Sequence, residues 1–296
     1  MNICFKCQKP IDKLRKHGLH RACFKALFDL IDEEDDFIDI YLPKSANNLE
    51  KKLSQETFLH GNFKKYSAIL HDKQYILKPT SDYPELSKTE YLCNQLAEAM
   101  GLEVSPYYLI HFMDNEDCFL SYNFMQDYKG TDLKHIYHFM EPDKYNVEQL
   151  LKVVEHNTQR LTELQKIINL CLFDAIIGND DRHGRNIGLI ATASNYVLSP
   201  FYDNTSYFAV EDERLLGADL NPKGCIAIES TKEPTVKDYA AEFIRLGYRN
   251  QVSAFVKHLD LSELQKLVQD SFLSDKRKKA MINFIVKRYQ ELHNVL

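Results

Sequence analysis

The sequence predicts an α+β protein with two lobes, because strand-like segments dominate its first half and helical periodicity dominates its second. Residues 66–70 and 74–78 are rich in β-branched and aromatic side chains and flank a short turn, as the two strands of a hairpin do. Residues 107–112 and 118–124 are predicted to form further strands. From about residue 132 onward, apolar residues recur at helical spacing.

The helices are predicted from apolar stripes and from glycines that can end a helix. Residues 90–100 form one such stripe, with Gly101 as the C-cap, and a longer stripe ends near Gly178. The longer stripe consists of Leu161, Leu164, Ile168, Leu172 and Ala175. Two more helices are expected around residues 262 and 281–289. We therefore divide the chain into a leader, 1–28, an N-lobe that carries the sheet, 29–127, and a helical C-lobe, 128–296.

Composition excludes several classes of protein. With 44% hydrophobic residues, including 17 Phe and 17 Tyr, the chain can build a substantial core. With a net charge of -6, the chain lacks the basic surface of a protein that binds nucleic acid directly. The basic residues of the leader are interpreted as a solvated face. No secretory signal is recognisable, and the longest apolar run, 167–177, is too short for a bilayer. We expect a cytoplasmic location without membrane contact.

The segment 177–190 is the most informative part of the sequence for chemistry. It places polar and charged residues between two apolar flanks, which is a common way to hold catalytic groups rigidly. Asp181 and Asn186 have the Asp-x4-Asn spacing of the protein-kinase catalytic loop, where the aspartate accepts the proton of the substrate hydroxyl and the asparagine binds magnesium.

Three further residues complete the set that phosphoryl transfer from ATP needs. Asp203 follows an apolar strand a short way past the loop, and with Asn186 it would supply hard oxygen ligands to Mg²⁺. Lys78 closes a predicted strand and Glu90 lies in the next helix, so the lysine can hold phosphates while paired with the carboxylate. Each residue has an ordinary alternative: a turn or cap for Asp203, a strand-end charge for Lys78, a first-turn carboxylate for Glu90.

The motifs 179–186 and 201–203 resemble the catalytic loop and the metal-binding motif of HipA-family serine/threonine kinases, and 89–102 resembles the helix after their nucleotide-binding lysine. The resemblance covers roughly 55–290. It implies a kinase-like fold with a small β-rich N-lobe, ATP and Mg²⁺ as cofactors, Asp181 as the catalytic base, and Asn186 and Asp203 as metal ligands. The residues that it brings near the nucleotide are Lys78, Glu90, His183 and Arg185.

Other parts of the family's site are assigned by position. Tyr122, Asn123 and Phe124 would form the hinge strand that faces adenine. The Ser-x-Ser-Gly start of the family's phosphate loop is missing, so Gly61 and Asn62 are the nearest candidates for phosphate contact. Ser54 is the nearest candidate for the family's regulatory autophosphorylation.

The short layout before the kinase core resembles the HipT kinases of three-part toxin–antitoxin systems. This resemblance implies a toxin that phosphorylates a protein, an aminoacyl-tRNA synthetase, and that is neutralised by HipB-like and HipS-like antitoxin proteins. Two alternatives stay open from the residues alone. One is a small-molecule kinase of the same fold, and the other is an inactive kinase-like adaptor that binds zinc.

Three of the seven cysteines gather in the leader, together with a histidine. Cys4-x2-Cys7 followed by His20-x2-Cys23 has the spacing of a tetrahedral zinc site built from two short ligand pairs. Such a short segment has little core of its own, so a metal ion could supply its folding energy. The alternative is that the cysteines are small buried hydrophobic residues of a docked helix, with His20 at the surface.

Overall fold

The computed structural model describes residues 3–11, 15–32, 35–41, 65–80, 83–112, 115–141 and 144–296. Their contacts divide the chain into two compact units. The first unit comprises residues 1–91 and 105–129, and the second comprises 92–104 and 130–296. Among the described residues, no helix has both the length and the apolar character that crossing a bilayer requires. The α+β class predicted from the sequence is confirmed.

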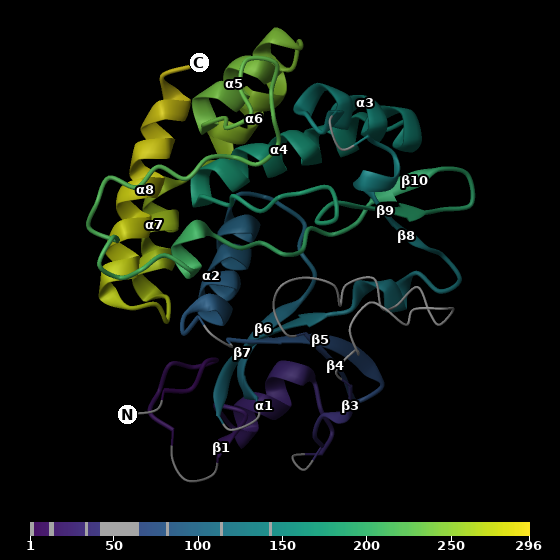
Figure 1. Ribbon diagram of the computed structural model, residues 1–296. Helices are drawn as coiled ribbons and strands as arrows, with labels where there is room; N and C mark the ends of the chain where they lie inside the picture. Colours follow the sequence, from purple (N-terminus) through teal and green to yellow (C-terminus); the bar gives the residue numbers. More distant parts are fainter. Residues whose placement is uncertain are drawn as a thin grey trace. The chain divides into compact units, whose positions relative to one another are not determined.

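The first unit is built on an antiparallel five-stranded sheet with the order β3-β4-β5-β7-β6 (Figure 1). Its strands are β3 (Ile38–Tyr41), β4 (Tyr66–Leu70), β5 (Lys73–Pro79), β6 (Tyr107–Phe112) and β7 (Glu116–Tyr122). The predicted hairpin is present: β4 pairs with β5, and both His71 and Asp72 take the positive φ angles that a tight hairpin turn requires.

The leader forms the small hairpin β1 (Arg15–Lys16) and β2 (Leu19–His20), followed by helix α1 (Arg21–Phe28). Phe24 and Phe28 of α1 are buried in one cluster with side chains from four strands of the sheet. These strand residues are Ala68, Leu70, Tyr75, Leu77, Ile110, Phe112, Cys118 and Leu120. Because alternate residues of a strand face opposite sides, α1 covers the face opposite to Lys78.

The second unit is helical around α4 (Leu161–Ile177), which contacts α3 (Val147–Thr158), α5 (Val236–Arg245), α6 (Arg249–His258) and α8 (Asp275–His293) (Figure 1). Helix α7 (Leu261–Asp270) packs on α8. Helix α2 (Leu86–Ala99) begins in the first unit, and its residues from Leu92 onward belong to the second. A three-stranded sheet completes the second unit in the order β10-β9-β8, with β8 (Leu133–His135), β9 (Gly188–Ala191) and β10 (Tyr196–Leu198).

Three details differ from the sequence prediction. Strand β7 ends at Tyr122, and Asn123 caps a short 3-10 helix, Phe124–Asp127, so the predicted hinge strand does not extend through Asn123 and Phe124. Leu161 is largely exposed at the start of α4, because the stripe faces the core only from Leu164 onward. Strand β8 falls in a region that was predicted to be helical.

Gly178 ends α4 with a left-handed φ of 72°, and Gly101 follows α2 with a similar φ of 77°. A Cβ atom at Gly178 would stand 2.9 Å from Pro222 and 3.1 Å from Phe284, whereas one at Gly101 would meet nothing within 4 Å. We expect Gly101→Ala to lower the free energy of unfolding by about 1–2 kcal/mol through backbone strain alone. Gly178→Ala should cost about 1–3 kcal/mol more because it also overpacks the core.

Urea unfolding of the two variants and the wild-type protein measures both effects. Equal losses at the two positions would contradict the packing that the structure gives to Gly178.

Candidate active site and metal centre

The loop 178–187 is held between two elements of the second unit. It leaves the C-terminus of α4 and runs directly into β9, whose antiparallel pairing with β10 returns the chain to the same place at Phe201 to Asp203. Two further hydrogen bonds close this arrangement. The Ser206 hydroxyl donates to the Ile177 carbonyl at 2.6 Å, and the Tyr207 amide donates to the Gly178 carbonyl at 2.8 Å. The hairpin therefore brings the two predicted motifs together from separate stretches of sequence.

Arg182 is the centre of this arrangement, and its guanidinium group is buried. Its Nε and one terminal nitrogen donate to the two carboxylate oxygens of Asp174 at 2.8 and 2.9 Å, and that terminal nitrogen also donates to Asn204 Oδ1 at 2.7 Å. The other terminal nitrogen donates to the carbonyls of Asn186 and Tyr202 at 3.2 and 2.7 Å. All five N–H donors of the side chain are thus used.

The charge of Arg182 is secured by its partner. Burial opposes a charged guanidinium, but the Asp174 carboxylate raises the pKa of Arg182 above its ordinary value. The network extends on both sides. Asn179 donates to Asp174 at 2.9 Å, and Asn204 donates to Asn94 of α2 at 3.0 Å. Arg182 therefore links α4, the loop and the segment that carries Asp203 through one network of hydrogen bonds.

Neither Arg182 nor Asp174 was predicted from the sequence to have a role. A signal was present, because Asp174 is a lone carboxylate in the apolar run of α4, and a buried carboxylate requires a partner. The sequence does not say which cation supplies that partner.

Asp181 lies on the exposed side of the loop, where its carboxylate can meet a substrate. Its amide is fixed by Asn179 Oδ1 at 3.0 Å, and its carbonyl accepts from the His183 amide at 2.8 Å. His183 is half exposed, with Nε2 at 3.8 Å from Asp181 Oδ1. Arg185 is also exposed and lies over the Tyr137 ring, 5.4 Å from its centroid. The backbone of the loop is thus held firmly while these three side chains stay accessible.

Asn186 and Asp203 have features that suit metal ligands. The Asn186 side chain is buried, and its amide nitrogen donates to the Asp181 carbonyl at 2.9 Å. This bond directs the amide oxygen away from the carbonyl, and no hydrogen bond to that oxygen is found among the described residues. Asp203 is partly buried and takes a left-handed φ of 52°, which is uncommon outside glycine and concentrates at functional sites. Both oxygens are hard ligands of the kind that Mg²⁺ prefers.

In the first unit, Lys78 and Glu90 form an ion pair and both side chains are largely buried. Lys78 Nζ also lies over the ring of Phe119, its cross-strand neighbour on β7, at 5.6 Å from the centroid. The structure thus brings together the strand lysine and the helix carboxylate that were predicted from the sequence to form a pair. Gly61, Asn62 and Ser54 lie outside the described residues.

The residues assigned to the hinge are in the first unit as well. The Tyr122 hydroxyl donates to Asp127 at 2.7 Å. Asn123 is buried, donates to Gln74 at 2.8 Å and accepts from the Met125 amide at 3.2 Å. Its side chain therefore holds the turn at the end of β7.

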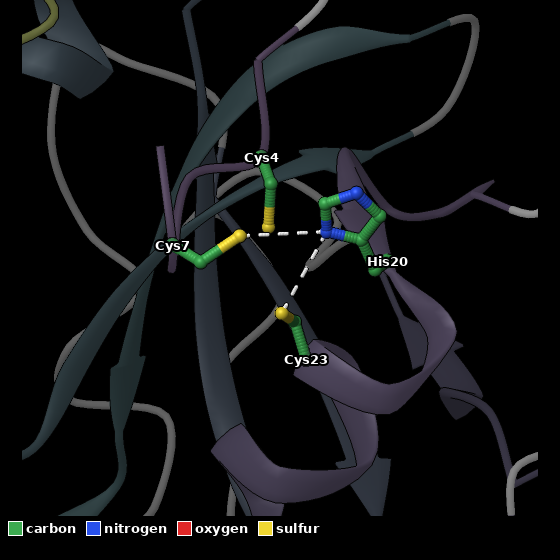
Figure 2. Close-up of side chains that lie close together, drawn as sticks. All are labelled: Cys4, Cys7, His20 and Cys23. Atoms are coloured by element: carbon green, nitrogen blue, oxygen red, sulfur yellow. Dashed lines mark hydrogen bonds between the residues drawn. The ribbon is translucent and has the colours of Figure 1, made fainter. Parts of the chain in front are cut away.

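The four leader residues singled out from the sequence come together as one cluster, which we call the Cys3His cluster: Cys4, Cys7, His20 and Cys23 (Figure 2). One ligand atom from each lies within 4.8 Å of every other. Cys4 is fully buried, and the other three are partly exposed. Burial opposes ionisation of the Cys4 thiol. Hydrogen bonds from the backbone of Cys7, His20 and Lys6 outweigh this effect and lower the pKa of the thiol to about 6.

The fold and the motifs define a family. Residues 50–287 match the family described as the HipA-like C-terminal domain, so the chain belongs to that family. Among curated proteins, it is 23% identical over 235 residues to a Haemophilus influenzae protein that is provisionally named a kinase. The match covers 70% of this chain and 68% of that protein.

Two solved structures share the fold. One is the Helicobacter pylori proinflammatory kinase CtkA, with a TM-score of 0.64 and 15% identity over 78% of this chain and 92% of that chain. The other is HipA of the Shewanella oneidensis toxin–antitoxin system, solved with HipB and operator DNA. It has a TM-score of 0.53 and 16% identity over 74% of this chain and 58% of that chain. The HipA-like kinase fold expected from the motifs is confirmed.

If Arg182 organises the loop, removing its charge should destabilise the second unit strongly. We expect Arg182→Met to lower the free energy of unfolding by about 3–5 kcal/mol, because it leaves the buried Asp174 carboxylate without its partner. The matched control is Arg185→Met, the same change at an exposed position of the same loop, which should cost less than about 0.5 kcal/mol.

The double variant Asp174→Leu/Arg182→Met separates the ion pair from the shape of the side chains. It should recover part of the loss, since a buried pair replaced by apolar groups is tolerated better than a single buried charge. Denaturant unfolding followed by circular dichroism measures all three variants. An Arg182→Met protein as stable as the Arg185→Met protein would contradict the role given to the guanidinium.

Proposed function

We propose that this protein is an ATP- and Mg²⁺-dependent serine/threonine protein kinase. The observation that carries the proposal is the fixed arrangement of the loop 178–187 against the segment of Asp203, within a chain of the HipA-like family. The kinase names of the Haemophilus and Helicobacter relatives support it. The Cys3His cluster takes no part in phosphoryl transfer in this proposal.

Seven residues share the chemistry, each with its own role. Asp181, accessible on a fixed backbone, accepts the proton of the attacking hydroxyl. Asn186 Oδ1 and the Asp203 carboxylate would hold Mg²⁺, and the ion would supply positive charge that offsets the negative charge of the transferred phosphoryl group. Lys78, oriented by Glu90, contacts the α- and β-phosphates. His183 and Arg185 lie beside Asp181 on the loop and add hydrogen-bond donors to the phosphoryl group.

The proposal also assigns the residues that would contact the adenine base and the phosphates of ATP. Tyr122, Asn123 and Phe124 mark the end of β7, and we assign adenine to this edge of the sheet. Gly61 and Asn62 stay our candidates for phosphate contact, and Ser54 for autophosphorylation.

We extend the proposal to a growth-arresting toxin of a toxin–antitoxin module. The Shewanella HipA structure was solved with its partner HipB, which supports a HipB-like antitoxin here. The resemblance to HipT kinases adds a HipS-like antitoxin and an aminoacyl-tRNA synthetase as the phosphorylated protein. A cytoplasmic location stays a prediction.

Replacement of the two carboxylates tests the mechanism. Asp181→Asn should lower kcat about 10²–10⁴-fold because the base is lost, while the stabilisation of the protein by Mg²⁺ and ATP remains. Asp203→Asn should remove both transfer and that stabilisation because a metal ligand is lost. Phosphate transfer from labelled ATP and thermal unfolding with Mg²⁺ and ATP measure the two effects.

Asp219→Asn is the control, because Asp219 is an exposed carboxylate whose ion pair is with Lys287 at the surface. It should leave transfer unchanged. An Asp181→Asn protein that transfers phosphate at the wild-type rate would refute the assignment of the base.

The class of acceptor needs its own experiment. Cell lysate incubated with labelled ATP and the wild-type kinase should gain label in a protein band, at a serine or threonine identified by mass spectrometry. The Asp181→Asn protein is the control. Label found only in small metabolites would replace the protein-kinase proposal by the small-molecule kinase of the same fold.

A further inference from the structure

We propose that the Cys3His cluster binds one Zn²⁺ ion as a closed structural site, which fastens the leader to the face of the sheet opposite Lys78. The distances between the ligand atoms suit this ion. His20 Nδ1 lies 3.5 Å from Cys7 Sγ and 3.7 Å from Cys23 Sγ. Bond lengths of about 2.3 Å to sulfur and about 2.0 Å to nitrogen, at tetrahedral angles, place sulfur and nitrogen about 3.5 Å apart.

The second nitrogen of His20 supplies an independent observation. His20 Nε2 lies 3.0 Å from the Pro10 carbonyl oxygen. A carbonyl oxygen can only accept, so Nε2 carries a proton, and in the neutral ring that metal binding requires Nδ1 then has the lone pair. That lone pair points toward the thiols of Cys7 and Cys23 (Figure 2). A backbone carbonyl that fixes the tautomer and the ring of a ligating histidine is the usual support of a zinc site.

The number and the chemistry of the ligands define the kind of site. Three thiols and one imidazole are soft and borderline ligands, which select Zn²⁺ over Mg²⁺. Four protein ligands fill a tetrahedral shell and leave no position for a substrate, so the ion is structural. Cys4 is buried, but Cys7 and Cys23 are only partly buried, whereas cysteines that serve merely as small core residues are usually buried.

The ligands come from two segments that the ion would join. Cys4 and Cys7 lie in a turn closed by two hydrogen bonds, from the Cys4 amide to the Lys9 carbonyl and from the Gln8 amide to the Cys4 carbonyl. His20 ends β2, and Cys23 lies in the first turn of α1. A metal ion between them would close the leader on itself without a long chain between the ligand pairs.

The leader is in turn attached to the sheet at its edge and on one face. The His111 amide of the edge strand β6 donates to the His17 carbonyl at 2.9 Å, and His17 Nδ1 donates to the His111 carbonyl at 2.9 Å. Phe24 and Phe28 cover the sheet face through α1. Helix α1 has only eight residues, too few to be stable by itself. The ion therefore stabilises the cover of the apolar face and, through it, the sheet that carries Lys78.

Metal content is the direct test. The full-length protein, purified without a histidine tag, should contain one equivalent of zinc by plasma mass spectrometry. Cobalt substituted for zinc should give the visible absorption bands of a tetrahedral site with thiolate ligands. Protein that contains no zinc, that contains iron instead, or that has a Cys7–Cys23 disulfide after purification under reducing conditions would overturn the proposal.

Variants locate the ion. Cys7→Ser and Cys23→Ser should each lose most of the zinc, while Cys225→Ser, the same change at a partly exposed cysteine of the second unit, should retain all of it. Full zinc content in Cys7→Ser and Cys23→Ser would place the ion elsewhere and refute the site.

A second test needs no variant, so it applies even where a substitution prevents folding: the wild-type protein is treated with a zinc chelator. Chelation should lower Tm by several degrees, and one equivalent of Zn²⁺ should restore it, whereas Mg²⁺ should not. A Tm that chelation leaves unchanged would overturn the structural role. None of these measurements depends on kinase activity, so the zinc proposal and the kinase proposal can fail separately.

Discussion

The loop 178–187 depends on the buried guanidinium group of Arg182. Arg182 has five N–H donors. Two bind the carboxylate of Asp174 on α4, and the other three bind Asn186 in the loop and Tyr202 and Asn204 beside Asp203. A buried guanidinium cannot exchange a lost partner for water, so any movement of one segment away from the others leaves a donor unsatisfied. The loop can thus carry exposed side chains, Asp181 among them, on a backbone that is held as firmly as the core.

Local patterns in the sequence were sufficient for most of the fold. The hairpin β4–β5 follows from two short aromatic and β-branched runs around a turn, and the ends of α2 and α4 follow from Gly101 and Gly178, whose left-handed φ angles few other residues adopt easily. Strand β8 was missed because its three residues pair with β9, far away in the sequence, and carry no periodicity of their own. The end of β7 was misplaced for a related reason, since the Asn123 cap depends on Gln74 of another strand.

The candidate sites divide in the same way. Asp181 and Asn186, and likewise Cys4 and Cys7, are recognisable because a short and fixed spacing reflects a local geometric need. The groups that hold them in place are not recognisable in this way. The partners of Arg182 lie as far as 22 residues along the chain, and the carbonyl that orients His20 belongs to Pro10, a residue without any chemical signature. Support of this kind is decided by tertiary contacts, so only a structure reveals it.

The two proposed metal sites also have a chemical reason to stay distinct. Asn186 and Asp203 offer only oxygen, and Mg²⁺ binds such ligands while retaining water for exchange with the phosphates of ATP. The Cys3His cluster offers three sulfurs and one nitrogen, which hold Zn²⁺ far more tightly than oxygen does. A structural zinc ion is enclosed by four protein ligands, whereas a magnesium ion bound through one or two carboxylates and the phosphates of ATP keeps several water ligands. Under the two proposals, ligand softness alone would let one chain keep a structural zinc ion in its leader and exchange magnesium at Asn186 and Asp203.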